Sequence, residues 1–115
     1  MTKLVLLANS HTDLEANEIT GRVLLARIMR SLQSITIIDN KDKLELVMKF
    51  ETLCKCNINK SRDEFCLLMW EQLEQLKTLQ DNDLAELSAF RIELGHMSHA
   101  MKILTKGNIN ESTNH

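Results

Sequence analysis

The chain has 115 residues, of which 43% are hydrophobic and 26% are charged, and its formal net charge is −2. This composition predicts one folded domain and excludes a disordered chain, which would carry fewer apolar residues and a larger net charge. The weakly negative balance also disfavours a generally basic protein that binds nucleic acid.

Few residues in this sequence interrupt regular structure. Proline is absent, and Gly21, Gly95 and Gly107 are the three glycines. Aromatic side chains make up 3% of the chain, so aliphatic residues and methionine must fill the interior, which favours packed helices over a β-sandwich. We therefore expect an all-α, four-helix bundle-like single domain over residues 1–107 and a polar, disordered tail over residues 108–115.

The first predicted helix runs from a capping box at residues 12–15 to about Leu32. In this box the Thr12 hydroxyl accepts an early amide N–H and Glu15 reaches back to the cap. The apolar face that follows is wide, which predicts the central and most buried helix. Gly21 costs about 1 kcal/mol within a helix, so it predicts the close approach of another helix. The short apolar run at residues 4–7, before the box, fits either a strand or a lead-in helical turn.

Residues 34–38 are rich in β-branched side chains and are the β-like segment of the chain. Inside the chain their candidate partner is the run at residues 4–7; otherwise they form an extended linker or an edge that pairs across a dimer. Residues 39–40 predict a turn and cap, and a second helix follows over about residues 41–54. Its inward side chains are expected to be Leu44, Val47, Met48, Phe50 and Leu53.

Two further helices are predicted to form an antiparallel hairpin. Ser61–Glu64 is a second capping box, and the third helix runs from it to about Leu79. Its inward side chains are expected to be Phe65, Leu68, Met69, Leu73 and Leu76. The fourth helix covers about residues 83–106, with Gly107 as its stop. Short connections favour antiparallel neighbours, so the first two helices should pack across this hairpin.

An apolar seam on the fourth helix provides the candidate interaction surface. Its members recur at steps of three and four residues, the spacing that one partner helix requires. The segment 62–93 also carries three basic and eight acidic residues, and this acidic surface suits a basic partner. If the third helix covers the seam, less of this surface remains for another protein. The candidate partner-binding residues are Phe90, Leu94, Met97, Met101, Leu104, Glu71, Glu74 and Glu86.

The cysteines indicate a reducing compartment. Cys54, Cys56 and Cys66 are an odd set, and the short apolar run at the N-terminus does not predict a secretory signal, so we expect a cytoplasmic protein. Together with two histidines, His96 and His99, they could supply a tetrahedral zinc site. The alternative is that the cysteines pack as small apolar residues and the histidines lie on the surface.

Two short motifs resemble those of known helical families. The segment Arg91–His96 has the pattern R-x₄-H and resembles the HEPN ribonucleases, in which arginine and histidine of two protomers cleave RNA without a metal. Ile92 stands where that family usually has a polar residue. The segment His99–Lys102 has the pattern H-x-x-K and resembles the phosphoacceptor stretch of histidine phosphotransfer domains, although Ile103 replaces the expected glycine. The first resemblance implies an acid/base role for His96 and phosphate binding by Arg91.

The first helix also has a loosely basic side. Arg22, Arg27 and Arg30 would contact DNA if this were a transcriptional regulator, or would be surface charges that flank a core helix. Against these alternatives we expect a small non-enzymatic regulator or adaptor of the chaperone, anti-activator or immunity type. It would act through protein–protein helix packing as a homodimer, without a cofactor or metal, and neither a membrane nor nucleic acid is expected as its partner.

Overall fold

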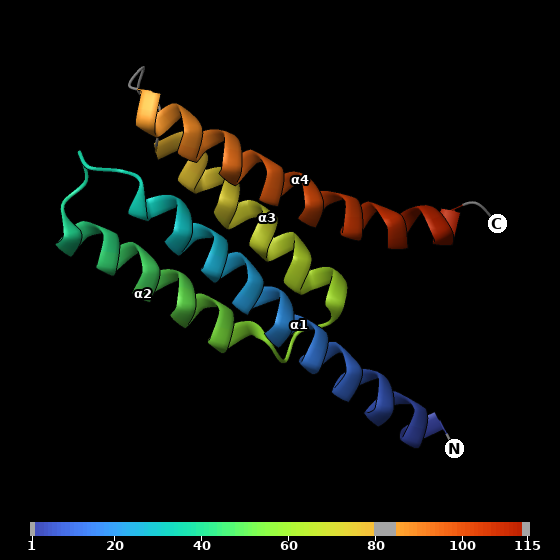
Figure 1. Ribbon diagram of the computed structural model, residues 1–115. Helices are drawn as coiled ribbons and strands as arrows, with labels where there is room; N and C mark the ends of the chain where they lie inside the picture. Colours follow the sequence, from blue (N-terminus) through green and yellow to red (C-terminus); the bar gives the residue numbers. More distant parts are fainter. Residues whose placement is uncertain (1, 80–84, 114–115) are drawn as a thin grey trace.

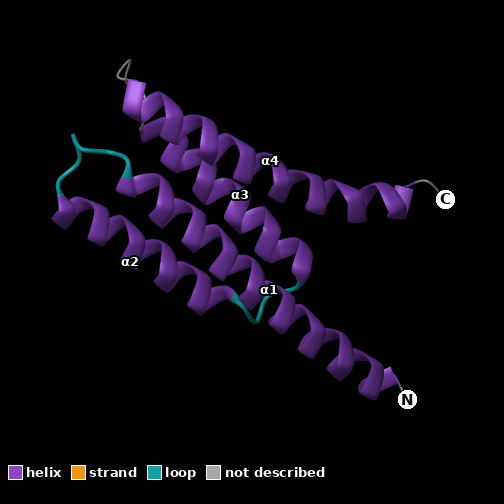
Figure 2. Cartoon of the chain, in the orientation of Figure 1, coloured by secondary structure: helices purple, strands orange, loops and turns teal. Residues whose placement is uncertain are grey.

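The computed structural model describes the backbone of residues 2–79 and 85–113, and the side chains of residues 13–78 and 87–105. Four helices account for nearly all of it: α1 (Thr2–Gln33), α2 (Asn40–Asn57), α3 (Arg62–Leu79) and α4 (Ala85–Thr113) (Figure 1). No strand occurs among the described residues (Figure 2). The predicted all-α, four-helix bundle-like fold is therefore confirmed.

The first helix begins ten residues earlier than the capping box predicted, since α1 starts at Thr2. Residues 4–7 are thus helical, which decides between the two alternatives for this run. The helix continues through residues 12–15 because no proline or glycine interrupts them. Asp13, from the predicted box, instead accepts a hydrogen bond at 3.2 Å from the backbone N–H of Arg62, the first residue of α3.

Residues 34–38 form the loop between α1 and α2 and do not pair as a strand. Ile35 is buried in the core, and its backbone N–H donates to the carbonyl oxygen of Leu32. The carbonyl oxygen of Ile35 in turn accepts a hydrogen bond from the ammonium group of Lys43 on α2. Ile35 therefore anchors the loop and Ile38 packs partly buried against the core, while Ile37 remains exposed.

The predicted start of α3 is confirmed, whereas the predicted end of α4 was wrong. Ser61 precedes α3, and its hydroxyl accepts a hydrogen bond at 3.3 Å from the N–H of Glu64. The last helix passes Gly107 and ends at Thr113, because a glycine without positive φ lowers helix propensity but does not terminate a helix. The predicted domain boundary at residue 107 lies within α4, and residues 114–115 lie outside the described part.

The helices form two antiparallel hairpins, α1–α2 and α3–α4 (Figure 1). The α3–α4 pair is in the most extensive contact, and α1 contacts each of the other three helices. The Cα trace measures 55 × 30 × 16 Å. Its smallest dimension is close to that of two packed helix layers, about 14 Å. The molecule is therefore an elongated two-layer bundle. The first helix is central, as predicted, but among the described residues α4 buries more side chains than α1 does.

The core lies where α1, α3 and α4 meet, with α2 contributing two buried side chains. The seam predicted on α4 is buried from Leu87 to Met101, as are Phe65, Met69 and Leu73 of α3. On α1 the buried apolar side chains are those of Leu24, Ile28 and Leu32, which form a narrower stripe than predicted. Of the α2 side chains predicted to point inward, Phe50 is buried, whereas Leu44 and Met48 are exposed.

Gly21 allows the close approach of α2, as predicted. A Cβ atom at this position would lie 3.2 Å from the Cβ of Cys54 and 3.3 Å from its Sγ. These distances are shorter than ordinary van der Waals contact between carbon atoms. The absence of a side chain at Gly21 therefore sets the spacing between α1 and α2.

A polar clamp on α1, formed by Asp13, Asn17 and Thr20, holds the α2–α3 connection. Asn17 is fully buried, and its Nδ2 donates to the carbonyl oxygens of Ile58 at 3.0 Å and Lys60 at 2.8 Å. The guanidinium of Arg62 donates to Asn17 Oδ1 at 3.1 Å and to the Thr20 hydroxyl at 2.8 Å. The clamp thereby ties α1 to the α2–α3 connection and to the first residue of α3.

Candidate docking surface

The predicted interaction seam lies inside the bundle. Phe90, Leu94, Met97 and Met101 are buried against α3, and Leu104 is 42% exposed at the end of the seam. The four buried residues would reach another protein only if α3 moved away. An exposed docking surface must therefore be formed by other side chains.

The predicted acidic residues are in three different situations. Glu71 is exposed on α3, and the side chain of Glu86 lies outside the described residues. Glu74 accepts hydrogen bonds from the Ser98 hydroxyl at 2.6 Å and from the Lys77 ammonium at 2.9 Å. These two donors hold the pKa of Glu74 below its usual range. Its carboxylate therefore serves the contact between α3 and α4.

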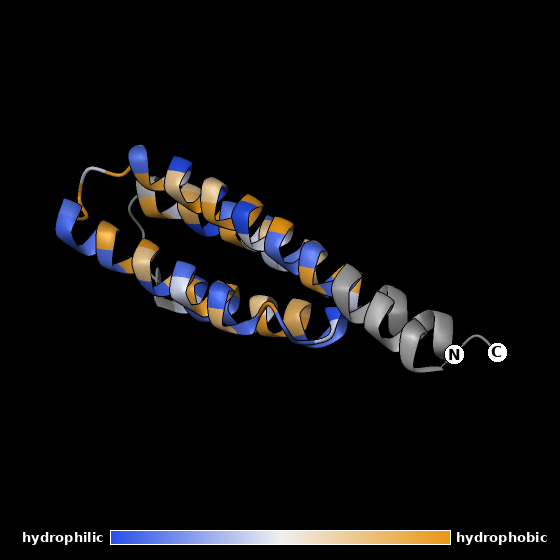
Figure 3. Cartoon of the chain, turned by 90° about the horizontal axis from the view of Figure 1, so that it is seen from below, coloured by the Kyte–Doolittle hydropathy of each residue, from blue (hydrophilic) through white to orange (hydrophobic). Residues whose placement is uncertain are grey.

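An apolar groove runs between α1 and α2 on the outside of the bundle. Its volume is about 430 Å³. The lining residues are Met29, Leu32, Gln33, Asn40, Lys43, Leu44 and Val47. In Figure 3 hydrophobic and hydrophilic residues alternate along the coloured parts of the helices. We call the hollow that these seven residues line the α1–α2 groove.

Large apolar side chains around the α1–α2 groove remain in contact with solvent. Met29 is 46% exposed, Leu44 is 58% exposed and Met48, one turn after Leu44, is 57% exposed. The periodicity of α2 predicted that Leu44 and Met48 would point inward. They do not, because Phe50 and Cys54 are the α2 residues that face the core, and Leu44 and Met48 lie about 100° and about 140° around the helix from that direction.

Cations and carboxylates alternate at this end of α2, where Lys41 and Lys43 lie among Asp39, Asp42 and Glu45. Lys43 lines the α1–α2 groove, which has no carboxylate among its lining residues. Lys41 is exposed one turn before Leu44, and Arg30 follows Met29 on α1. Neither Lys41 nor Arg30 makes an ion pair with a described residue. The groove is therefore lined by four apolar residues, two amides and the one cation Lys43.

A second hollow, of about 290 Å³, lies between α1 and α2 near Gly21 and Cys54, toward the other end of this helix pair. There the charges neutralise one another, because Arg22 pairs with Glu18 at 2.9 Å and Lys55 with Glu51 at 3.9 Å. At the end that contains Met29 and Leu44, the three cations are matched in number by Asp39, Asp42 and Glu45.

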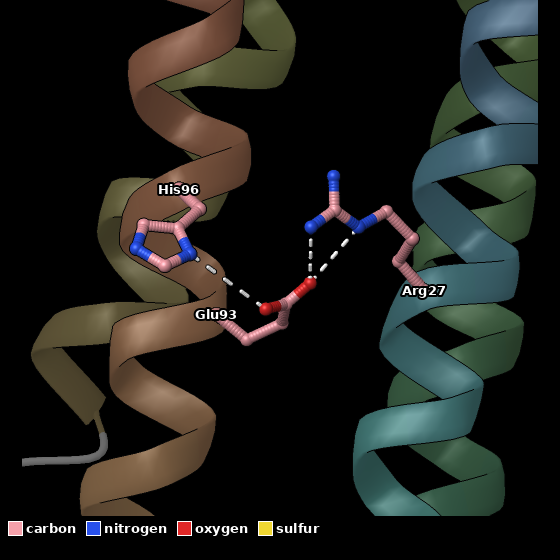
Figure 4. Close-up of polar contacts among 3 residues, drawn as sticks. All are labelled: Arg27, Glu93 and His96. Carbon is pink, nitrogen blue, oxygen red and sulfur yellow. Dashed lines mark hydrogen bonds and ion pairs between the residues drawn. The ribbon is translucent and has the colours of Figure 1, made fainter.

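The arginines proposed for DNA contact do not form one available basic row. Arg22 is paired with Glu18 on the same helix. Arg27 donates from Nε to Glu93 Oε1 of α4 at 2.9 Å and thereby links the two hairpins (Figure 4). Arg30 is the member of the set that has no ion pair with a described residue.

The R-x₄-H pair is divided between different sides of α4. Five residues on a helix correspond to about 500° of rotation, so Arg91 and His96 point about 140° apart. His96 is exposed, and its Nδ1 lies 3.8 Å from Oε2 of Glu93, the carboxylate that Arg27 also contacts (Figure 4). Within one chain the two residues therefore do not converge on one site.

The cysteines and histidines do not gather into a metal centre. No group of three or more potential ligands lies together among the residues whose side chains are described. Cys54 and Cys66 are buried, Cys56 is exposed, and all three are free thiols. Burial, and then the charge of Glu51, raise the pKa of Cys54 to about 11, and burial also raises the pKa of Cys66. The two buried thiols thus act as small apolar core residues.

The H-x-x-K motif lies on the outer side of α4. His99 is exposed, and the ammonium group of Lys102 lies 5.9 Å from the centroid of the Trp70 ring on α3. Lys102 and Trp70 also line a small hollow of about 170 Å³ together with Leu67 and Thr105. The lysine of the motif therefore contributes to α3–α4 packing through a cation–π contact.

Within the described part of the chain, no helix combines the length and apolarity that a membrane span needs. No protein-family model matches the sequence, and searches of curated proteins and of solved structures find no match. The surface chemistry of the chain itself is therefore the basis on which a function is proposed.

Proposed function

We propose that this chain is a small non-enzymatic regulator or adaptor, of the chaperone, anti-activator or immunity type, that binds another protein by helix packing. The observation that carries the proposal is the exposure of Met29, Leu44 and Met48 around a groove between two helices. A groove of this kind fits the apolar face of an amphipathic helix, which is a common mode of peptide recognition.

The strength of such a contact can be bounded from the side chains involved. Full burial of a leucine or methionine contributes about 1.5–3 kcal/mol, so three half-exposed side chains contribute about 3 kcal/mol together. Association costs at least about 4 kcal/mol in lost translational and rotational freedom. A partner must therefore add polar contacts around the groove, or further apolar contacts, to form a stable complex.

We also propose a homodimer that works in the reducing cytoplasm. Free thiols at all three cysteines support the compartment. Exposed Ile19 and Val23 on α1, and Ile92 and Ile103 on α4, support self-association away from the groove. Sedimentation at micromolar concentration should give about twice the 13.2 kDa chain mass. A 13.2 kDa species at every concentration would exclude the dimer.

Cross-linking in the native host tests the binding role. Leu44→Glu introduces a charge into the groove, whereas Leu67→Glu introduces the same charge at an exposed leucine of α3. We expect specific cross-linked partners with the wild type and with Leu67→Glu, and their loss with Leu44→Glu. Equal partner sets for all three proteins would contradict the proposal. RNA cleavage by the purified chain that His96→Ala abolishes would replace it with the ribonuclease alternative.

A further inference from the structure

We infer that the proposed homodimer forms through the outer face of α1, which packs antiparallel on the same face of a second copy. This inference rests on the proposed function and names the surface through which the chain associates with itself. Five residues of α1 recur at alternating steps of three and four, the spacing that a seam between two helices requires. We call them the α1 stripe: Ala16, Ile19, Val23, Ala26 and Arg30.

The α1 stripe lies on the side of its helix that faces away from the core. Ile28 is fully buried and marks the direction of the core. At 100° per residue, Ile19 lies about 180° around the helix from Ile28, and Val23 lies about 140° away. Ile19 is 62% exposed and Val23 is 52% exposed. Contact with a second copy would remove this apolar area from water, which is favourable.

The neighbouring helix α4 carries exposed apolar side chains as well. It contacts α1, and Arg27 of α1 donates a hydrogen bond to Glu93 of α4 (Figure 4). Leu94 is fully buried and marks the direction of the core on α4. Ile92 and Ile103 are exposed and lie about 160° and about 180° around the helix from Leu94. These two isoleucines would enlarge a contact that is centred on α1.

The two ends of the α1 stripe carry opposite charges. Arg30 is its last residue, and Glu15 directly precedes its first. Both side chains are exposed, and they lie about 20° and about 40° around the helix from Ile19, on the same outer face. Arg30 makes no ion pair with a described residue. A surface that is acidic at one end and basic at the other is complementary to a copy of itself turned end for end.

Two ion pairs flank the stripe without changing its charge balance. Glu18 pairs with Arg22 at 2.9 Å within α1, and Arg27 pairs with Glu93 of α4. Each pair joins one cation and one carboxylate. Neither end of the stripe therefore gains net charge from them.

The carboxylates at the start of α2 approach α1 from another side. These are Asp39, which directly precedes α2, and Asp42 and Glu45 within it. The α1 side chains that line the α1–α2 groove point, on average, about 110° around α1 from Arg30. None of the three carboxylates makes an ion pair with Arg30. The basic end of the α1 stripe therefore stays available to a second copy.

A two-fold axis at Val23 brings the unlike ends together. Glu15 lies eight residues before Val23 and Arg30 lies seven after it, which correspond to about 12 Å and about 10.5 Å along the helix. In two antiparallel copies, Glu15 of one copy therefore meets Arg30 of the other at both ends. By the same count the bulky Ile19 meets the small Ala26, which allows the helices to approach. Parallel copies would instead place Glu15 beside Glu15 and Arg30 beside Arg30, and these like charges repel each other.

Charge exchange at the two ends tests the interface. Sedimentation over a concentration series gives the dissociation constant of the dimer. Glu15→Arg and Arg30→Glu each create two pairs of like charges per dimer and should raise this constant about tenfold. Glu15→Arg/Arg30→Glu restores both unlike pairs and should return the constant to within about threefold of the wild type. Because both positions are exposed, circular dichroism should show the same helix content for all four proteins.

Lys49→Glu is the matched control for net charge. It changes the charge as Arg30→Glu does, at an exposed position of α2 outside the α1 stripe, and should leave the dissociation constant within about twofold. Equal weakening by Lys49→Glu and Arg30→Glu would reduce the effect to net charge and overturn the inference. Failure of the double variant to recover would overturn the antiparallel pairing of the two ends.

Substitutions at the centre of each exposed surface separate this inference from the proposed function. Val23→Glu should yield the 13.2 kDa monomer at micromolar concentration, whereas Leu44→Glu, in the α1–α2 groove, should stay dimeric. Dissociation by Leu44→Glu and not by Val23→Glu would overturn the inference and place the dimer contact in the groove. A monomeric wild type would exclude both the homodimer and this interface, and cross-linking would still decide the adaptor role.

Discussion

At the scale of single residues, Asn17 is the most deeply buried of the described polar side chains. It is fully buried, and it satisfies two carbonyl oxygens of the α2–α3 connection as well as the Arg62 guanidinium. An apolar substitution would leave these groups without a partner in a site that water does not reach. Each buried polar group left unsatisfied costs about 1–3 kcal/mol.

Asn17→Ala should therefore lower the free energy of unfolding by about 2–4 kcal/mol, measured by urea denaturation. Thr78→Ala is the control, because the Thr78 hydroxyl donates to the Glu74 carbonyl oxygen at an exposed site within one helix. That substitution should change stability by less than about 0.5 kcal/mol. A similarly small effect of Asn17→Ala would show that the connection is held by its other contacts.

Two of the helical glycines, Gly21 and Gly95, should respond differently to alanine. At Gly95 the nearest atom to an added Cβ is Lys77 Cδ at 3.8 Å, so Gly95→Ala should raise stability by about 0.5–1 kcal/mol through helix propensity. At Gly21 the same gain is opposed by the contact with Cys54 at 3.2 Å. Thermal unfolding should therefore rank Gly95→Ala above Gly21→Ala; the reverse order would refute close packing at Gly21.

Sequence patterns predicted some of these residues but not others. Gly21 was predicted as a point of close approach because a glycine inside a helix has a cost that needs a reason. Asn17 gave no such signal, since a polar residue near the start of a predicted helix is normally exposed. Its partners are 41 and 43 residues away along the chain, and only the assembled fold brings them together.

At the scale of secondary-structure elements, the α3–α4 hairpin contains an acid-sensitive contact. Ser98 and Lys77 donate hydrogen bonds to Glu74 and hold its pKa below the usual range in the folded state. The unfolded chain therefore binds this proton more readily than the folded chain. The stabilisation is complete above the ordinary glutamate pKa, about 4.3, and is lost as pH falls through the lower folded pKa.

Glu74→Gln should reduce the loss of thermal stability between about pH 5 and about pH 3, because it removes this group from titration. The midpoint of unfolding, followed by circular dichroism at several pH values, measures the effect. Glu71→Gln removes a carboxylate one turn away that is exposed on the same helix, and should leave the wild-type slope. Parallel slopes for Glu74→Gln and the wild type would show that the Ser98 contact does not stabilise the hairpin.

Helix positions were predicted better than helix ends. The capping box at Ser61 correctly marked the start of α3, because the connection before it breaks the helical pattern. The similar box at residues 12–15 did not mark a helix start, because the chain before it is helical as well. Its Asp13 side chain instead accepts a hydrogen bond from the first residue of α3. A capping motif thus predicts a helix start only where the chain also has a reason to stop being helical upstream.

At the scale of the whole molecule, the α1–α2 groove follows from which side of α2 packs on α1. The sequence shows that α2 has apolar residues on more than one side, but a periodic pattern does not say which side another helix will cover. The bundle has two layers, so one side of α2 stays uncovered by the described helices. The candidate surface could therefore be identified only from the structure.

This arrangement also predicts an order of local opening. Two buried side chains, Phe50 and Cys54, anchor α2. By contrast, α4 buries an uninterrupted seam consisting of Leu87, Phe90, Leu94, Met97 and Met101. Elements with few buried apolar contacts open at lower free energy than the global unfolding transition. We therefore expect α2 to detach from α1 while the α3–α4 hairpin remains folded.

Hydrogen exchange under native conditions measures this order. Amides of α2 should exchange through a lower-energy opening than those of α4 between Phe90 and Met97, and Phe50→Ala should accelerate exchange in α2 far more than in α4. Leu44→Ala, at an exposed position of the same helix, should leave both rates nearly unchanged. A common rate for α2 and α4 would mean that the bundle opens as one unit. The α1–α2 groove would then be a rigid feature and not one that a partner helix can widen.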